Sequence, residues 1–397
     1  MNSLRVSFFM TGDFPEGAAN ASRMKEYLKG LQKLGHSCEL NILWQSGFSS
    51  AGVNQTICGL WENVPFRFFN KKISRPLGYL GRFFDTLRAW ANSFLYVVKN
   101  RRKIDVAFLY CPDVYYFFPV FMALWLCRIP RVTERTELKS GLYTQPGKKK
   151  NLFYYLNRFD ERFCQLWSGQ CIVISDILWL HYLKQFGQKR MTLIPVIADL
   201  ERYKPDISKA KKGIIGYIGS FGIKDGVPGM LNAFAIAKKA NPSLRLKLMG
   251  YCENTAAVYK LIEQLHLYDS VEMTGLLTYN EVPKQLASCD LLLMNRINSL
   301  YANCGFPTKL AEYLALGIPT IATKVGDVEI YLTHQKNAYL ITPENDIELV
   351  NAILSRYTDY EQWNHLGLAG RQIANEHFNR EVCSKKLEDV FRKTIAK

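Results

Sequence analysis

The sequence lacks the patterns that mark several common kinds of site. None of its ten cysteines stands in a C-x-x-C pair, which argues against a zinc site or a disulfide framework. The G-x-G-x-x-G fingerprint of nicotinamide-binding proteins does not occur, and none of the six histidines lies in a metal-binding or catalytic motif. Most cysteines sit in apolar runs, so we expect buried thiols in a reducing cytoplasm.

Long apolar runs are also missing. The longest, from Val114 to Cys127, contains Pro119 and is shorter than the roughly 20 residues that a membrane-spanning helix needs. The first residues lack the basic start, long apolar segment and cleavage site of a signal peptide. We therefore expect no transmembrane segment and a cytoplasmic protein, with a peripheral position at the inner face of the cell membrane left open.

Acidic residues are scarce. The chain has 35 Asp and Glu against 51 Lys and Arg, a formal charge of +16. This surplus favours anionic partners: nucleotide diphosphates, lipid pyrophosphates, an acidic membrane leaflet or nucleic acid. Because the charge is dispersed and no helix-turn-helix, zinc or RNA-binding signature occurs, we expect no nucleic-acid partner.

Two α/β domains are predicted from the order of the patterns. Residues 5–43 read as strand, small-residue loop, helix and strand, the opening of a doubly wound parallel sheet. The polar stretch 196–213 contains Pro205 and has no apolar period, so it reads as a linker, after which the pattern restarts. We predict Rossmann-like domains over 1–204 and 205–378, followed by a C-terminal helix over 379–397.

The stretch 303–323 carries the strongest functional signal. Gly305 and Pro307 interrupt regular structure, Thr308 is predicted as the N-cap of a helix, and Gly317 ends that helix. A helix start exposes free N–H groups and the positive end of the helix dipole. Phosphate oxygens therefore fit between Phe306 and Lys309.

Glu312 lies one turn further along this helix, about 6 Å from Thr308 along the axis. That is about the step from a phosphate to the ribose of one nucleotide, so the carboxylate can accept hydrogen bonds from two ribose hydroxyls. The alternative is purely structural: Thr308 caps the helix, and Lys309 and Glu312 form a surface ion pair.

The run FPTKLAEYLALGIPTIAT resembles the nucleotide-sugar loop and helix of the retaining GT-B glycosyltransferases, the group 1 family, in its bacterial surface-polysaccharide branch. In that family two glutamates separated by seven residues grip the donor. Glu312 matches the second, which binds the ribose, whereas Cys304 stands at the first, which touches the transferred sugar. A branch with a P-T-K-x-x-E-Y run also lacks the first glutamate, so we interpret the difference as a subtype.

The resemblance implies a role for further residues. Lys224, in the loop GSFGIKDG, matches the basic position that neutralises the donor pyrophosphate, and Ser220 stands where many relatives have arginine. Lys224, Lys309 and Glu312 are thus the expected catalytic residues. The expected donor-binding residues are Gly17, Gly219, Ser220, Gly250, Gly275, Gly305, Phe306, Pro307 and Thr308.

The family also implies an architecture and a reaction. Two Rossmann-like domains would face each other across a cleft, with the C-terminal helix packing back on the first. A UDP- or GDP-linked sugar would be transferred with retention to a glycan or polyprenyl-pyrophosphate-linked acceptor, in capsule, O-antigen or exopolysaccharide synthesis. No metal or other cofactor is expected, and the sequence has no D-x-D pair. The alternatives are a nucleotide-sugar epimerase of the same build and a non-catalytic basic protein that binds nucleic acid or a membrane.

Two stretches of the first half are candidates for acceptor and membrane contact. Glu134, Arg135 and Glu137 follow a predicted strand and could meet the acceptor, or they could be mutually paired charges. Arg23 could assist the first loop, where the resemblance implies an approach to the donor phosphates and the acceptor. Residues 75–103 predict a basic helix with an aromatic stripe. Such a helix lies in a bilayer interface, or it buries its aromatic side in the core and exposes its basic side.

Overall fold

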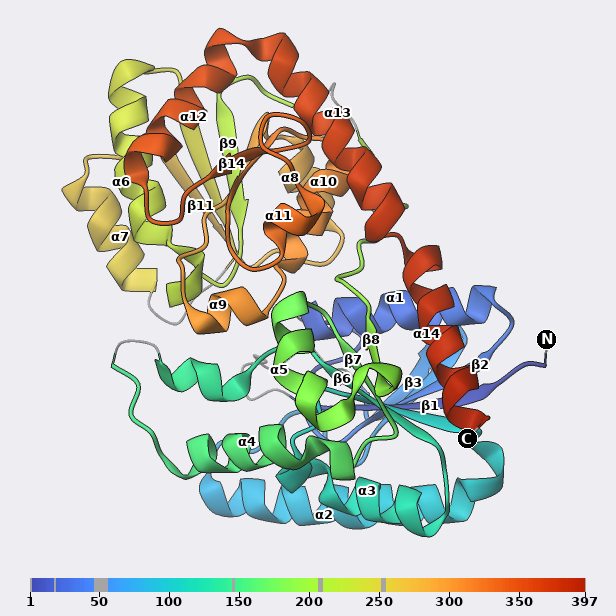
Figure 1. Ribbon diagram of the computed structural model, residues 1–397. Coiled ribbons are helices and arrows are strands. Elements are labelled where there is room, and N and C mark those ends of the chain that lie inside the picture. Colours follow the sequence, from blue (N-terminus) through green and yellow to red (C-terminus); the bar gives the residue numbers. More distant parts are fainter. Residues whose placement is uncertain are drawn as a thin grey trace. The chain divides into compact units, whose positions relative to one another are not determined.

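The computed structural model describes residues 2–17, 19–45, 56–144, 147–205, 210–250 and 255–396 (Figure 1). The chain divides into two compact units. Unit 1 comprises Met1–Pro195 with Arg380–Lys397, and unit 2 comprises Val196–Asn379. The boundary between the units thus lies between Pro195 and Val196, before the predicted domain boundary at residue 204. The reason is that Tyr203 is buried in unit 2, where its carbonyl accepts a hydrogen bond from Arg371 at 3.3 Å.

Unit 1 contains an eight-stranded sheet. Its strands are β1 (Arg5–Met10), β2 (Ser37–Ile42), β3 (Cys58–Trp61), β4 (Val64–Phe68), β5 (Val106–Tyr110), β6 (Arg131–Arg135), β7 (Gln170–Val173) and β8 (Met191–Leu193). They are ordered β3-β4-β2-β1-β5-β6-β7-β8, and all neighbours are parallel except β3 and β4. The order reverses between β1 and β5, which is where doubly wound sheets bind their ligands. The β3–β4 hairpin was not predicted.

Helices cover both faces of this sheet. They are α1 (Ala19–Lys33), α2 (Tyr79–Asn100), α3 (Val114–Leu126), α4 (Leu152–Phe163), α5 (Asp176–Phe186) and α14 (Arg380–Ile395). The C-terminal helix α14 packs on α1 and on the sheet: Phe391 lies against Phe8 and Phe108, and Arg380 pairs with Glu26 at 2.6 Å. In the part of the chain that is described, no helix combines the length and apolarity needed to cross a bilayer.

Unit 2 contains a six-stranded, wholly parallel sheet. Its strands are β9 (Ile214–Ile218), β10 (Arg245–Met249), β11 (Val271–Gly275), β12 (Leu291–Met294), β13 (Thr320–Thr323) and β14 (Tyr339–Ile341), in the order β11-β10-β9-β12-β13-β14. Here the order reverses between β9 and β12. The loops after these two strands are therefore where a ligand is expected.

The helices of unit 2 hold a core of aliphatic side chains against the sheet. They are α6 (Val227–Ala240), α7 (Thr255–Gln264), α8 (Glu281–Ala287), α9 (Leu300–Cys304), α10 (Thr308–Leu316), α11 (Val328–Tyr331), α12 (Asp346–Thr358) and α13 (Tyr360–His377). Leu231, Phe234 and Ile353 are fully buried between α6, α12 and the strands. This core fixes the start of α6, and with it the loop after β9.

Candidate functional site

The loops that follow β9 and β12 bring the predicted lysines into one site. The first loop continues through a short 3-10 turn, Ile223–Asp225, into α6, and the second continues through α9 into α10. Two hydrogen bonds join them: the Asn295 side chain donates to the carbonyl of Gly226 at 3.0 Å, and the Ile297 N–H donates to the carbonyl of Lys224 at 3.2 Å. The two loops therefore form one connected edge of unit 2.

Lys309 is the centre of this site. Its ammonium lies 2.7 Å from Asp225 Oδ1 and 3.1 Å from the Tyr217 hydroxyl, and it stands 4.3 Å from the centre of the Tyr217 ring. The surface pair with Glu312 that the sequence left open is thus not formed, because Lys309 pairs with Asp225. The Lys224 ammonium lies 4.6 Å from the ring centre of Tyr301.

Positive charge exceeds negative charge around Lys309. Burial lowers the pKa of the Lys309 ammonium and the nearby cations Arg296 and Lys224 lower it further, against the opposing effect of Asp225. Burial alone would raise the pKa of Asp225, but Lys309, Arg296 and Lys224 together hold it below its ordinary value. Three cations thus share one ionised carboxylate. The surplus favours binding of an anion.

Three of the predicted glycines meet at the carboxyl ends of neighbouring strands. The Gly219 N–H donates to Met249 O at 3.0 Å, and the Gly250 N–H donates to Gly275 O at 2.9 Å. A Cβ on Gly219 would lie 2.6 Å from the Lys309 ammonium, and one on Gly250 would lie 2.0 Å from Gly219 O. Gly250 also has φ of +119°. Only glycine allows this close approach of backbone and lysine. A direct contact with a donor stays a prediction for these glycines and for Ser220.

The start of α10 differs from the prediction. Pro307 is the N-cap and Thr308 is already the first helical residue, so the Thr308 hydroxyl makes no capping bond. Pro307 has no N–H, which leaves the amides of Thr308 and Lys309 as donors at this end of the helix. The Phe306 side chain is buried against Tyr331 and Phe378. Only its backbone can therefore face a ligand.

Arg296 connects α9 to the turn before α10. Its guanidinium donates to Ala302 O at 3.1 Å and to Gly305 O at 3.2 Å. Gly305 thus sits directly beside a buried cation. Cys304, at the end of α9, is buried.

The Glu312 carboxyl has partners that the sequence did not indicate. Burial raises its pKa, against the hydrogen bond from the Tyr203 hydroxyl and the positive charge of Arg202 and Lys309. The Arg202 guanidinium lies 3.5 Å from the ring centre of Tyr279 and donates to the Tyr203 hydroxyl at 3.1 Å. No local pattern marks Arg202 and Tyr203, because they lie in the stretch that reads as a linker.

Tyr313 fastens α10 to the sheet. Its hydroxyl accepts a hydrogen bond at 2.9 Å from the N–H of Ile218, the last residue of β9, and its side chain is fully buried. This contact fixes the positions of Lys309 and Glu312 relative to the glycine-rich loop after β9. Tyr313 is the last residue of the P-T-K-x-x-E-Y run, and this motif is the signal in the sequence that could have marked it as a site residue.

In unit 1 the candidates near the first loop are structural. Arg23 and Glu134 form a buried ion pair at 2.6 Å, and the Tyr27 hydroxyl donates to the same Glu134 oxygen at 2.8 Å. A Cβ on Gly17 would lie 2.7 Å from Asp13 O, so tight packing of the loop accounts for this glycine. Glu134 thus pairs with Arg23 and not with Arg135 or Glu137, and an acceptor contact of Glu134 stays a prediction. A donor contact of Gly17 stays a prediction.

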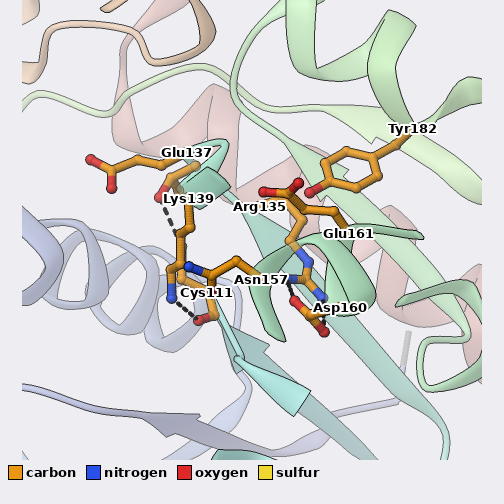
Figure 2. Close-up of a pocket in the computed structure, with 9 residues that line it drawn as sticks. Cys111, Arg135, Glu137, Lys139, Asn157, Asp160, Glu161 and Tyr182 are labelled. Atoms are coloured by element: carbon orange, nitrogen blue, oxygen red, sulfur yellow. Dashed lines mark hydrogen bonds and ion pairs between the residues drawn. The ribbon is translucent and has the colours of Figure 1, made fainter. Parts of the chain in front are cut away.

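A small polar pocket lies at the carboxyl ends of β5 and β6 (Figure 2). Arg135 pairs with Asp160 at 2.5 Å, and Lys139 pairs with Asp113 at 2.6 Å and donates to the carbonyl of Cys111 at 3.3 Å. The carboxylate of Glu137 points away from the Arg135–Asp160 pair in Figure 2. The residues that line the pocket are Cys111, Arg135, Thr136, Glu137, Lys139, Asn157, Asp160, Glu161 and Tyr182.

Comparison with protein families identifies unit 2. Residues 200–373 match the model of the family described as glycosyl transferases group 1. This range contains the cation site, the glycine loop and Glu312. Residues 200–373 are a group 1 glycosyltransferase domain.

The curated relatives of this chain are distant. The putative colanic acid biosynthesis glycosyltransferase WcaL of Escherichia coli (strain K12) is 24% identical over 245 residues, which are 60% of each chain. The chain therefore spans less than two thirds of this relative.

Solved structures extend the likeness to the whole chain at the level of the fold. Sucrose-phosphate synthase from Thermosynechococcus elongatus has a TM-score of 0.78, with 16% identity and 99% of both chains covered. Anabaena Alr3699/HepE, solved with UDP and glucose, has a TM-score of 0.74 and 17% identity, with 98% of this chain and all of that chain covered. The fold is GT-B, with two Rossmann-like units. The shared cleft stays a prediction.

Proposed function

We propose that this chain is a retaining glycosyltransferase that moves a sugar from a UDP- or GDP-linked donor to a hydroxyl of a glycan acceptor. The observation that carries the proposal is the cluster of three cations, Lys224, Arg296 and Lys309, around the single carboxylate of Asp225, next to Glu312 in a group 1 domain. The relative named for colanic acid biosynthesis supports a role in polysaccharide synthesis. The structural neighbour solved with UDP supports a nucleotide-sugar donor.

The site residues suit the departure of a nucleoside diphosphate. Lys224 and Lys309 would balance the charge that develops on the leaving diphosphate, together with the amides at the start of α10. Glu312 would accept hydrogen bonds from the ribose hydroxyls. In the proposed reaction the departing phosphate oxygen takes the proton of the acceptor hydroxyl, so neither a protein nucleophile nor a metal ion is required.

The acceptor is proposed to be lipid-linked and to meet unit 1. The polar pocket of Figure 2 supplies charged groups at the carboxyl end of its sheet. Helix α2 adds an apolar surface, because Leu80, Phe83 and Phe84 are 77%, 58% and 65% exposed. Its buried residues are instead Asp85, Ala89, Ser93 and Val97. The start of α2 thus favours contact with a bilayer, whereas Trp90 and Phe94 further along pack against the core of unit 1.

Nucleotide binding tests the donor site. We expect UDP or GDP, but not an oligonucleotide, to raise the melting temperature of the protein. Lys224→Ala and Glu312→Ala should each weaken nucleotide affinity by about tenfold or more in calorimetric titration. The exposed residues Lys336 and Glu361 provide charge-matched alanine controls that should bind as the wild type does. Unchanged affinity in both site variants would refute the placement of the donor.

The reaction itself is tested with a panel of nucleotide sugars and a lipid-linked acceptor extract. Sugar transfer that requires the acceptor supports the proposal. Turnover of the donor in the absence of any acceptor would favour an epimerase instead.

A further inference from the structure

Helix α4 exposes its apolar side and buries its polar side. Leu152, Tyr155 and Phe159 are 70%, 63% and 50% exposed, and Phe163 is exposed as well. The buried residues of the helix are Asn157, Asp160 and Glu161. A surface helix of a globular protein normally shows the opposite arrangement. The apolar stripe of α4 is therefore not explained by the core of unit 1.

The buried polar side of α4 is fully engaged. Asp160 binds the Arg135 guanidinium, Glu161 accepts hydrogen bonds from the N–H and the hydroxyl of Ser140, and Asn157 accepts one from the Tyr115 hydroxyl at 3.1 Å. These contacts fix the rotation of the helix about its axis. The aromatic side is thus held outward by specific polar bonds on the inner side.

Charges on this stretch are sorted by sign. Between residues 147 and 166 the only carboxylates are Asp160 and Glu161, and both are buried. The lysines 148–150 and Arg158 and Arg162 are exposed. The same sorting holds for 75–103, whose only carboxylate, Asp85, is buried while its arginines 88, 101 and 102 are exposed. Both helices thus offer apolar side chains together with positive charge alone.

Helix α3 connects the two surfaces. It contacts α2 and α4, and the three helices lie side by side along one side of unit 1 (Figure 1). Its Tyr115 ring lies 6.3 Å from that of Phe153, and Phe118 is 45% exposed. Exposed aromatic residues therefore continue from α4 onto α3.

We propose that α4 and the lysine run before it form a second contact with an anionic lipid bilayer, in addition to the contact proposed for α2. Aromatic and leucine side chains would enter the interface, and the lysines and arginines would lie at the level of the anionic headgroups. A second copy of the chain fits this surface poorly, because pairing would place like charges opposite each other.

The contact would place the polar pocket next to the bilayer. The inner side of α4 lines that pocket, and an α-helix with its side chains is only about 10–12 Å thick. A lipid-linked acceptor could then reach the carboxyl end of the unit 1 sheet without leaving the membrane. The inference rests on the proposed function for this lipid-linked acceptor, but binding to vesicles is measured independently of any transfer reaction.

Sedimentation with vesicles tests the proposal. Wild-type protein should bind phosphatidylcholine vesicles that contain phosphatidylglycerol at low salt, and should bind pure phosphatidylcholine vesicles much less. The variant Leu152→Ser with Phe159→Ser should lose about tenfold in partition. As a matched control, Ile236→Ser with Ile347→Ser removes two residues of unit 2 that are 54% and 74% exposed, and should bind as the wild type does.

The outcomes separate the alternatives. Wild-type-like vesicle binding of the α4 variant, at an unchanged circular dichroism spectrum, would overturn the proposal. So would a wild-type dimer in light scattering that becomes a monomer in the α4 variant, since a second copy would then cover this surface. Replacing the lysines 148–150 with glutamine should remove much of the salt-sensitive binding. UDP or GDP affinity should stay unchanged in all these variants, so that a failure of the donor site is recognised separately.

Discussion

The Lys309 ammonium donates to Asp225 Oδ1 at 2.7 Å, although the two residues are 84 positions apart in the chain. Their side chains are only 13% and 3% exposed. Each loop of the candidate site supplies one member of the pair, so the pair holds the two loops together. Arg296 and Lys224 also lower the pKa of Asp225, so three cations surround this one carboxylate.

Breaking this pair should affect stability and binding differently. Lys309→Met leaves the Asp225 carboxylate buried without its partner, and should cost about 3 kcal/mol of unfolding free energy. The double variant Lys309→Met with Asp225→Asn should regain most of that stability, because no charge is then left buried. Nucleotide affinity should stay weak in both. Urea unfolding and calorimetric titration give the two quantities.

A surface pair provides the control for this experiment. Lys324 and Glu329 lie 3.7 Å apart with side chains 39% and 58% exposed. Lys324→Met should change the unfolding free energy by less than about 0.5 kcal/mol. Full recovery of nucleotide affinity in the double variant would show that Lys309 serves the fold and not the ligand.

Replacing Glu312 should make the fold more stable and lower the affinity for the nucleotide. Burial raises the pKa of this carboxyl, so the folded state holds a proton at pH values where the unfolded chain has released it. Stability is therefore lost as the pH rises from the ordinary value through the raised one. At neutral pH, Glu312→Gln should unfold about 2–4 °C higher by calorimetry. Below the ordinary glutamate pKa the two proteins should melt alike; a less stable variant at neutral pH would contradict this assignment.

The Tyr203 hydroxyl should set the pH dependence of nucleotide binding. Its hydrogen bond to Glu312 opposes the raised pKa of that carboxyl, so Tyr203→Phe should raise the pKa further. If the ionised carboxylate binds the ribose, affinity falls as the pH is lowered through this pKa. The fall should therefore begin at a higher pH in Tyr203→Phe. Identical affinity profiles against pH in both proteins would exclude this role.

Glu388 of α14 should contribute to stability above acidic pH. Burial would raise its pKa, but Lys385 and Arg392, each at 2.6 Å, lower it from 4.5 to about 2. A depressed pKa stabilises the fold above the ordinary value, and this contribution is lost as the pH falls from 4.5 towards 2. Glu388→Gln should cost about 1–2 kcal/mol at neutral pH after allowance for its exposed partners.

The exposed neighbour Asp389 gives the matched control for Glu388. Asp389→Asn should leave the unfolding free energy within about 0.5 kcal/mol of the wild type. The difference between Glu388→Gln and wild type should shrink in denaturant unfolding as the pH is lowered through that window. If the difference in unfolding free energy stayed constant with pH, Glu388 would stabilise the fold through packing alone.

The amino-acid order by itself determined the local elements of this protein. The strand, helix and strand predicted over residues 5–43 are β1, α1 and β2, because their apolar residues follow strand and helix spacing and are separated by small and polar residues. The helix after Pro307 was predicted with Lys309 and Glu312 on it, although its cap was assigned one residue late. The division between the two units lies at the start of the predicted linker, but polarity did not reveal that Tyr203 within it packs in unit 2.

Only the tertiary structure decided which side chains meet. Asp225 beside Lys309 and Tyr203 beside Glu312 are long-range pairs, and no local period encodes a partner that the chain brings back from a distant segment. The outward orientation of the apolar stripe of α4 has the same origin. Helical spacing shows that an apolar stripe exists, but the bonds made by Asp160 and Glu161 on the inner side decide that the stripe of α4 faces away from the core.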